Sequence, residues 1–300
     1  MAPDERVPAK CGRGCAAASS SAVLLSATRR PPPNRANSVK CLGNKTAVTF
    51  ITGTDTGVGK TLLTGLLLDF LRRHGVRALA MKPFCSGGTG DVDFLDALQA
   101  GELPRSQLNP FYFPEPVAPL VSARRHRRDI PLVAAAQAVR GVVRKCDHLL
   151  IEGSGGLMVP LGENYAATDL IRRLKCAVIV VARNRLGTIN HTLLTVSALR
   201  GAGIHALKVV LMDGAPGPAG AAADEDVSVH SNPKILAELL RPAPLWQVPF
   251  LGSNATRIEV VKKNRKKIEK TLARILDSAT VSPTFFASMF RGGNKNEKSF

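Results

Sequence analysis

From Thr46 onward, short apolar runs alternate with longer segments in which apolar residues recur at helical spacing. The runs predict buried β-strands at Ala47–Ile51, Ala78–Lys82, His148–Glu152, Ala177–Ala182 and Leu207–Met212. The longer segments predict helices at Thr61–His74, Asp91–Ala100, Leu132–Lys145, Asn190–Gly201 and Pro233–Leu240. Apolar strands alternating with helices are typical of a parallel sheet buried on both faces. The expected fold is therefore α/β, a single domain whose mostly parallel sheet is flanked by helices on both faces.

The two ends of the chain do not follow this alternation. Residues 1–45 are rich in Ala, Ser, Arg and Pro and predict a disordered basic extension. An organelle transit peptide or a start codon assigned too far upstream would look the same, and the sequence leaves these alternatives open. Residues 255–300 predict a basic helix over Asn264–Leu276 and then a loose tail. We therefore expect one folded domain at 46–254 between two basic ends.

The net charge of +18 lies mostly in those ends. Eight Lys/Arg against two acids give residues 1–45 a charge of +6, and eleven against four give residues 255–300 a charge of +7, which leaves +5 for the middle. No nucleic-acid-binding motif accompanies the ends, so we expect solvated tails and no nucleic-acid partner. No apolar run approaches the ~20 residues of a membrane span, and six scattered cysteines fit a reducing compartment. The expected location is cytoplasmic, with no membrane partner.

A glycine loop with the sequence GTDTGVGKT, Gly53–Thr61, joins the first predicted strand to the first predicted helix. In that context the loop backbone and the helix N-terminus converge on phosphate oxygens, which predicts a P-loop domain. Lys60 is expected to reach the β- and γ-phosphates, and the Thr61 hydroxyl is a candidate Mg²⁺ ligand. Thr54 stands where the common pattern has its first glycine, and Gly53 comes one position earlier. The expected nucleotide-binding residues of the loop are Gly57, Val58, Gly59, Lys60 and Thr61.

Polar residues at the ends of two other predicted strands complete a candidate site. Glu152 ends an apolar strand, and a carboxylate there points into the crevice where parallel sheets bind ligands. Mg²⁺ usually takes one or two carboxylates, so a second is expected from Asp91 or Asp93. Lys82 also ends a strand, and a lysine beside a phosphate site can stabilise charge that develops during phosphoryl transfer.

Five blocks of the chain together resemble the dethiobiotin synthase family. They are Gly53–Thr61 (GTDTGVGKT), Lys82–Gly87 (KPFCSG), Asn109–Ser122 (NPFYFPEPVAPLVS), Glu152–Leu161 (EGSGGLMVPL) and Leu186–Thr195 (LGTINHTLLT), in the family's order. The phosphate loop alone is shared with many ATPases, whereas the other blocks are far more specific. The resemblance covers roughly residues 46–254 and neither end.

The resemblance implies a cyclo-ligase of biotin biosynthesis with ATP and Mg²⁺ as cofactors. In the family's reaction an amine of 7,8-diaminopelargonic acid takes up CO₂ as a carbamate, and the carbamate then receives the γ-phosphoryl group of ATP. The second amine displaces phosphate and closes the ring of dethiobiotin, with ADP as the other product. Carbamate and triphosphate are both anionic, so Lys60, Lys82 and Mg²⁺ would bring them together. The resemblance also implies a homodimer with sites shared between subunits.

Carried over by position, Thr61, Asp91 and Glu152 would hold Mg²⁺. Asp91 is favoured over Asp93 because only Asp91 fits the family's Asp-[Ala/Val]-x-x-Leu. Thr56, Lys82 and Ser86 would face the diamine and its carbamate, and the catalytic set would be Thr56, Lys60 and Lys82. The residues that would receive the substrate carboxylate, at a helix start contributed by the other subunit, are Leu186, Gly187, Thr188, Ile189 and Asn190.

Asp213 departs from the family's pattern. It follows the strand Leu207–Met212 and stands where members often have an asparagine that reads adenine. A carboxylate accepts hydrogen bonds and donates none, so the preferred base stays open. Triphosphate binding is therefore expected more firmly than adenine specificity.

Three alternatives to this family fit the sequence less well. Related amide-forming ligases, such as cobyrinic acid a,c-diamide synthases, usually carry a glutaminase domain, which the residues after Asn254 are too few to form. ParA/MinD-like partitioning ATPases, whose basic tails would touch DNA or membrane, typically have a second lysine early in the phosphate loop, but Thr54, Asp55 and Thr56 occupy that region here. A degenerate paralogue is disfavoured because every expected polar position is filled.

Overall fold

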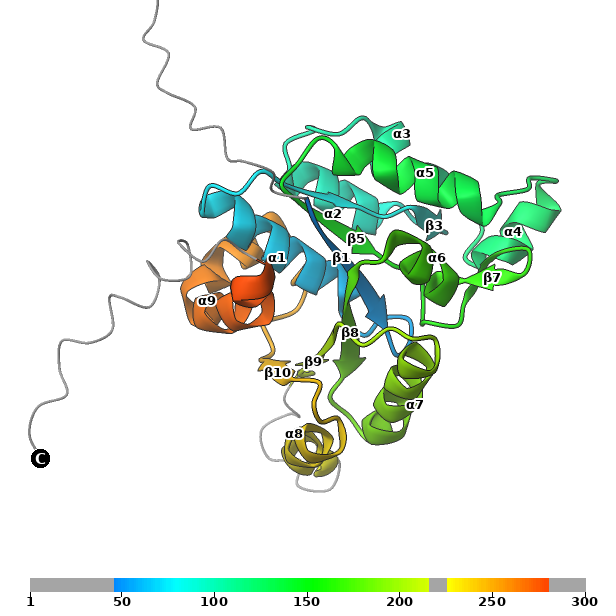
Figure 1. Cartoon of the computed structure of the whole chain (residues 1–300). Coiled ribbons are helices and arrows are strands. Elements are labelled where there is room, and N and C mark those ends of the chain that lie inside the picture. The colour runs from blue at the N-terminus through cyan, green and yellow to red at the C-terminus, as the bar shows by residue number, and fades with distance from the viewer. Residues whose placement is uncertain (1–45, 216–225, 281–300) are drawn as a thin grey trace, which may run out of the picture. The chain divides into compact units, whose positions relative to one another are not determined.

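The computed structural model describes residues 46–215 and 226–280, so the extension and the loose tail predicted at the ends lie outside the described residues. Its central sheet has six strands in the order β10-β9-β8-β1-β5-β2, and every neighbouring pair is parallel (Figure 1). The strands are β1 (Ala47–Gly53), β2 (Ala78–Met81), β5 (His148–Glu152), β8 (Ala177–Arg183), β9 (Leu207–Met212) and β10 (Leu245–Val248). The predicted α/β class with a mostly parallel sheet is confirmed.

Five of these strands coincide with the five predicted runs to within two residues. The sixth, β10, was not predicted because Leu245–Val248 is short, lies between prolines and includes Gln247. It pairs only with β9 at the edge of the sheet, where a strand does not need to be apolar on both faces. Two small accessory sheets were also not predicted, parallel β3 (Phe84–Ser86) with β4 (Phe111–Phe113) and antiparallel β6 (Pro160–Gly162) with β7 (Tyr165–Ala166).

Helices cover both faces of the central sheet. On one face α1 (Lys60–Arg73) packs on β1, β2 and β5, and α9 (Ile258–Thr280) and α2 (Gly90–Leu98) pack against α1. On the other face lie α5 (Leu132–Val143), α6 (Ala167–Leu174) and α7 (Thr188–Gly201), while α8 (Ser228–Leu239) packs against α7 and β10 (Figure 1). This division follows from right-handed crossovers, because only the β1–α1–β2 connection runs toward the β2 edge of the sheet.

Some helix boundaries differ from the predictions. The helix α8 begins at Ser228, five residues before the predicted start at Pro233, and the Asp226 carboxylate just before it accepts hydrogen bonds from the Ser228 N–H and hydroxyl. Pro233 therefore lies inside the helix. Likewise, α7 begins at Thr188, so Asn190 stands inside its first turn. Three short helices were not predicted: α3 (Arg105–Leu108), α4 (Pro119–Arg125) and α6.

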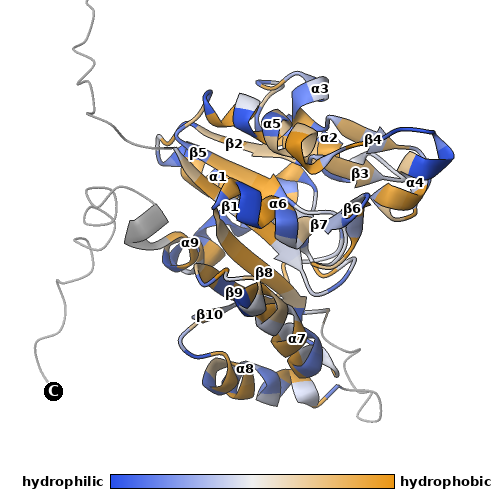
Figure 2. Ribbon diagram, turned by 45° about the vertical axis from the view of Figure 1, so that its right-hand side comes forward, coloured by the Kyte–Doolittle hydropathy of each residue, from blue (hydrophilic) through white to orange (hydrophobic). Residues whose placement is uncertain are grey.

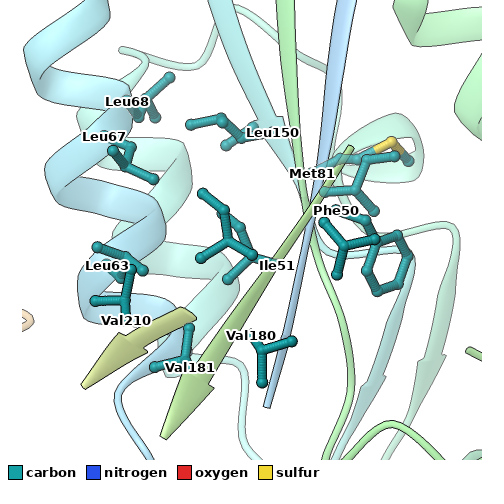
Figure 3. Packing of buried hydrophobic residues seen from close by; sticks show 14 of the residues in the cluster. Phe50, Ile51, Leu63, Leu67, Leu68, Met81, Leu150, Val180, Val181 and Val210 are labelled. Atoms are coloured by element: carbon teal, nitrogen blue, oxygen red, sulfur yellow. The ribbon is translucent and has the colours of Figure 1, made fainter. Parts of the chain in front are cut away.

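The core lies on both sides of the central strands, because alternate residues of a strand point to opposite faces. Ile51 and Val181 point toward Leu63 and Leu67 of α1, whereas Phe50 lies on the opposite side of the strands (Figure 3). These side chains are almost fully buried, and each such burial stabilises the fold by roughly 1.5–3 kcal/mol. The core therefore fixes the positions of the strand ends that carry the predicted site.

The helix α9 contains the predicted basic helix and extends it in both directions. Its apolar side, with Val261, Ile268 and Leu272, is buried in the core, and the hydrophilic side faces outward (Figure 2). Among the residues that the structure describes, no helix combines the length and apolar character that crossing a membrane requires. The predicted domain boundary at residue 254 stays a prediction.

Candidate active site

The phosphate loop connects β1 to α1, and its backbone explains the shifted first glycine. A Cβ at Gly53 would stand 2.9 Å from the Asp55 carbonyl oxygen, so the close approach of the loop requires glycine there and not at Thr54. Gly57 and Gly59 have φ of 71° and 102°, the left-handed region that favours glycine. The Thr54 N–H donates to the Val181 carbonyl at 3.0 Å, which fixes the start of the loop to β8.

The Lys60 side chain is buried beneath this loop, and its Nζ donates to the Asp55 carbonyl oxygen at 2.9 Å. Burial lowers the pKa of Lys60 to about 8, and nearby Glu152 partly opposes that shift. Among the described residues this buried ammonium donates one hydrogen bond, to the Asp55 carbonyl, so it is suited to an incoming anion. Burial removes the Lys60 ammonium from water. An anion such as a triphosphate would compensate for the lost hydration with an opposite charge.

Two strand ends and the first turns of two helices bring four polar side chains together beside Lys60. Lys82, which follows β2, donates from Nζ to Glu152 Oε1 at 2.7 Å and also to Asp91 Oδ2. Thr61 in the first turn of α1 donates its hydroxyl to the same Glu152 Oε1 at 2.7 Å. We call Thr61, Lys82, Asp91 and Glu152 the acid–lysine cluster. The strands β1, β2 and β5 assemble it because they lie side by side with parallel carboxyl ends.

Within this cluster Glu152 is fully buried, and its second oxygen, Oε2, has no hydrogen-bond partner in the described structure. Burial raises the pKa of Glu152, while Lys82 opposes the shift. Burial alone would lower the pKa of Lys82, but Glu152 and Asp91 together raise it above its ordinary value. A buried oxygen without a hydrogen-bond partner lowers the stability of the fold. Its presence at this position therefore indicates that a ligand pairs with it.

The structure separates the two candidate aspartates. Asp91 reaches Lys82, whereas Asp93 accepts hydrogen bonds from the Thr89 hydroxyl at 2.7 Å and from Arg105 at 2.6 Å. These two donors lower the pKa of Asp93. Asp93 therefore faces away from the acid–lysine cluster and stabilises the start of α2.

The other two residues predicted to face the substrate lie in β3 and in the phosphate loop. Ser86 in β3 has a buried hydroxyl oxygen without a hydrogen-bond partner among the described residues. Such a hydroxyl is available to a polar ligand. Thr56 is exposed at the tip of the phosphate loop, and its hydroxyl would stand 3.8 Å from a Cβ built on Gly155. The glycines after Glu152 therefore let that loop approach the phosphate loop.

A cavity of about 800 Å³ opens beside the phosphate loop. Its lining includes Thr56, Gly57 and Val58 of the loop, together with Asp213, Gln247 and Phe250. Asp213 accepts hydrogen bonds from the Asn184 side chain at 2.9 Å and from Gln247 at 2.8 and 2.9 Å. Sequence reasoning found Asp213 but missed Asn184 and Gln247. Asn184 directly follows β8, so the rule that located Glu152 would have identified it, whereas Gln247 lies on β10, which the apolar pattern did not predict.

The predicted substrate-carboxylate loop lies apart from these groups. Leu186, Gly187, Thr188, Ile189 and Asn190 are absent from the cavity lining, which ends at Arg185 in that part of the chain. Leu186 is 79% exposed, and its N–H donates to Asp226 at 2.6 Å. Gly187 caps α7 with a φ of 87°, so the loop presents a helix N-terminus at the surface.

No group of three or more His, Cys, Asp or Glu side chains within the described ranges could hold a metal ion by itself. The acid–lysine cluster instead offers two carboxylates and a hydroxyl. This donor set is incomplete for a metal alone but is suited to Mg²⁺, which usually keeps phosphate oxygens and water among its ligands.

Comparisons with known proteins agree with the motifs. A family described as an AAA domain matches residues 48–246. ATP-dependent dethiobiotin synthetase BioD of Anaeromyxobacter sp. (strain Fw109-5) is 40% identical over 212 residues, which are 69% of this chain and 92% of that protein. The protein of the same name from Bacillus licheniformis is 37% identical over 167 residues, 54% of this chain and 71% of that protein.

Among solved structures, the MinC:MinD cell division protein complex of Aquifex aeolicus is similar at 15% identity with a TM-score of 0.45. The match covers 85% of this chain and 99% of that chain. A likeness at this level carries no information about activity.

Proposed function

This chain belongs to the dethiobiotin synthetase family, and from that premise we propose that it closes the ring of dethiobiotin from 7,8-diaminopelargonic acid and CO₂ with ATP and Mg²⁺. The chain is an enzyme of biotin biosynthesis by its family. The observation that supports the finer reaction is the acid–lysine cluster beside the phosphate loop, with its buried, unpartnered Glu152 oxygen.

The residues of this cluster fit a Mg²⁺ ion. Glu152 Oε2 is buried without a partner, and the Thr61 hydroxyl stands 2.7 Å from Glu152 Oε1, so oxygen donors converge at one place. We propose Thr61, Asp91 and Glu152 as the residues that hold the ion. When bound, Mg²⁺ would supply positive charge that neutralises the phosphate oxygens.

Lys82 holds both proposed carboxylate ligands in the structure. Its ammonium must give up at least one of them when a cation and nucleotide bind, and it is then available to an anion on the same side of the site. We propose that it turns to the substrate carbamate and the transferred phosphoryl group, where charge develops.

The other roles follow from position. Lys60 would exchange its contact with the Asp55 carbonyl for phosphate oxygens, and the N–H groups of Gly57, Val58 and Gly59 would contact the same phosphates. Ser86 and Thr56 would orient the diamine. The second amine then needs only alignment with the activated carbamate, which positioning can accelerate by several orders of magnitude.

We propose a homodimer that presents Leu186–Asn190 of one subunit to the site of the other. Leu186 just before α7 is 79% exposed and Leu194 in the middle of α7 is 61% exposed, and such exposed apolar side chains are suited to an interface. Sedimentation should give the mass of two chains. Leu194→Glu should give a single-chain mass and lose activity, and a fully active single chain would contradict the shared site.

The reaction is tested by mixing the purified protein with the diamine, bicarbonate, Mg²⁺ and ATP and measuring released phosphate. We expect release only when the diamine is present. ATP turnover that ignores the diamine would contradict the proposal and favour a partitioning ATPase.

A further inference from the structure

Asp213 places a hydrogen-bond acceptor in the lining of the cavity beside the phosphate loop. On the proposed function, a triphosphate on Lys60 places its base in this cavity, between the loop residues and the group formed by Asp213, Gln247 and Phe250. Phe250 supplies an apolar ring there, and Asp213 supplies the acidic polar edge.

Asp213 is held in place by a neighbouring amide that has no donor to spare. The Asn184 Nδ2 group donates to Asp213 Oδ1 at 2.9 Å and to the Val229 carbonyl at 3.0 Å, which uses both of its hydrogens. Asn184 is itself fixed, because its Oδ1 accepts a hydrogen bond from buried Asn232 at 3.0 Å. This chain of contacts orients the carboxylate of Asp213 and leaves Asn184 unable to donate to a base.

Gln247 shows what the open edge of Asp213 accepts. Its Nε2 donates to both carboxylate oxygens, at 2.8 and 2.9 Å, so one N–H group bridges the edge that faces the cavity lining. Gln247 is exposed and lies on the edge strand β10, where its side chain has room to move. An N–H donor of a nucleotide base can replace it at the same two oxygens.

Bases differ in what they offer to such an edge. Guanine presents two adjacent donors, N1–H and the 2-amino group, which match the two oxygens of a carboxylate. Adenine presents an acceptor, N1, beside its single amino donor, so one carboxylate oxygen would face a lone pair. Arg183 and Arg185 also line the cavity and donate only, which suits the carbonyl O6 of guanine and not the amino group of adenine.

We propose that Asp213 makes this site accept guanine, so that the chain binds GTP at least as tightly as ATP. The two bonds from N1–H and the 2-amino group to the carboxylate carry the recognition. An asparagine at the same place would offer one donor and one acceptor and would favour adenine instead.

The test is equilibrium titration of the full chain with the Mg²⁺ complexes of GTP, ATP and ITP, without the diamine. ITP differs from GTP only by lacking the 2-amino group. We expect GTP to bind at least as tightly as ATP and about fivefold or more tighter than ITP, because a good paired contact is worth roughly five- to 150-fold in discrimination. Tighter binding of ATP than of GTP, or equal binding of GTP and ITP, would overturn the proposal.

Asp213→Asn then identifies the residue responsible. It should shift the GTP-to-ATP affinity ratio toward ATP by about tenfold or more and remove the difference between GTP and ITP. The two amides that contact Asp213 both donate to Oδ1, which an asparagine carbonyl can replace, so the variant should fold. Glu163→Gln, at an exposed acid that is paired with Arg124 and is not part of the cavity lining, is the matched control, and it should keep the preference for GTP.

An equal loss of affinity for all three nucleotides in Asp213→Asn would overturn the assignment. These titrations do not depend on ring closure. Tight GTP binding without diamine-dependent turnover would therefore contradict the proposed reaction alone, whereas no binding of any triphosphate would contradict both.

Discussion

Two buried acids on the same side of the sheet, Glu152 and Asp69, have very different surroundings. Asp69 in α1 accepts hydrogen bonds at both oxygens, from Arg265 of α9 and, at 3.1 Å, from Arg73. Glu152 accepts from Lys82 and Thr61 at one oxygen, and the other is unpartnered in the described structure. The fully paired acid joins two helices, and the half-paired acid faces the phosphate loop. A buried acid therefore indicates a ligand site when part of its hydrogen-bonding capacity is unused.

The largest effect is expected for Glu152→Gln. The glutamine keeps an oxygen for Thr61 and Lys82 but removes the charge at the proposed Mg²⁺ site, so diamine-dependent phosphate release should fall at least about hundredfold. Stability should hold, because burial raises the pKa of Glu152 and the folded chain therefore disfavours its charged form. Asp91 still pairs with Lys82 in this variant, so urea unfolding should show a free energy of unfolding within about 1 kcal/mol of the wild type.

The matched control is Glu163→Gln, which changes an exposed acid paired with Arg124 and should leave turnover unchanged. Full activity in Glu152→Gln, or a large loss of stability with it, would place Glu152 in the same structural class as Asp69.

Lys82→Ala should also abolish ring closure while nucleotide binding stays largely intact. Without the ammonium, Asp91 and Glu152 face each other uncompensated, so the variant should melt at a lower temperature. Added Mg²⁺ can neutralise the same two carboxylates, and it should raise the melting temperature of the variant more than that of the wild type. Lys145→Ala, at an exposed lysine bonded to Gln107, is the control. Equal loss of nucleotide binding and ring closure would mean that Lys82 is misassigned.

Asp69→Asn should lower stability and leave activity unchanged. It breaks a largely buried pair with Arg265 and weakens the contact between α1 and α9, which should cost about 2–3 kcal/mol. For a domain of this size the melting temperature should fall by about 5–10 °C. The kcat and KM of the folded variant should match the wild type. A specific loss of kcat at unchanged stability would contradict the structural role.

The smallest effect is expected for Asp147→Asn. This acid also forms a two-point contact with an arginine, Arg77, at 2.7 and 3.0 Å, but both side chains are exposed. Solvent screens such a pair, so the melting temperature should change by no more than about 2 °C. A change as large as that of Asp69→Asn would show that burial does not distinguish the two arginine pairs.

The sequence predicted the fold class and the strands that position the site because those strands are buried on both faces and therefore continuously apolar. It also predicted which strand ends carry Lys82 and Glu152. It did not reveal β10, since an edge strand carries a weaker apolar signal. It also did not reveal that α8 begins before Pro233, since the contact between Asp226 and Ser228 lies outside the apolar pattern.

Spacing along the chain could not predict which polar groups meet. Asp91 and Asp93 are two residues apart, yet only the structure separates the one bonded to Lys82 from the one bonded to Arg105. The contact between Asp69 and Arg265 joins residues 196 positions apart and has no local signature. Unused hydrogen-bonding capacity, as at Glu152, becomes visible only when every neighbour is in place.

The central claim is that the half-paired cluster around Glu152 builds dethiobiotin. It is tested most directly by incubating the chain with ¹³C-bicarbonate, the diamine, Mg²⁺ and ATP and measuring the mass of the product by mass spectrometry. We expect dethiobiotin carrying one ¹³C from the wild type and from Asp69→Asn, and none above background from Glu152→Gln. ATP consumption by the wild type without labelled dethiobiotin, or equal product from Glu152→Gln, would contradict it.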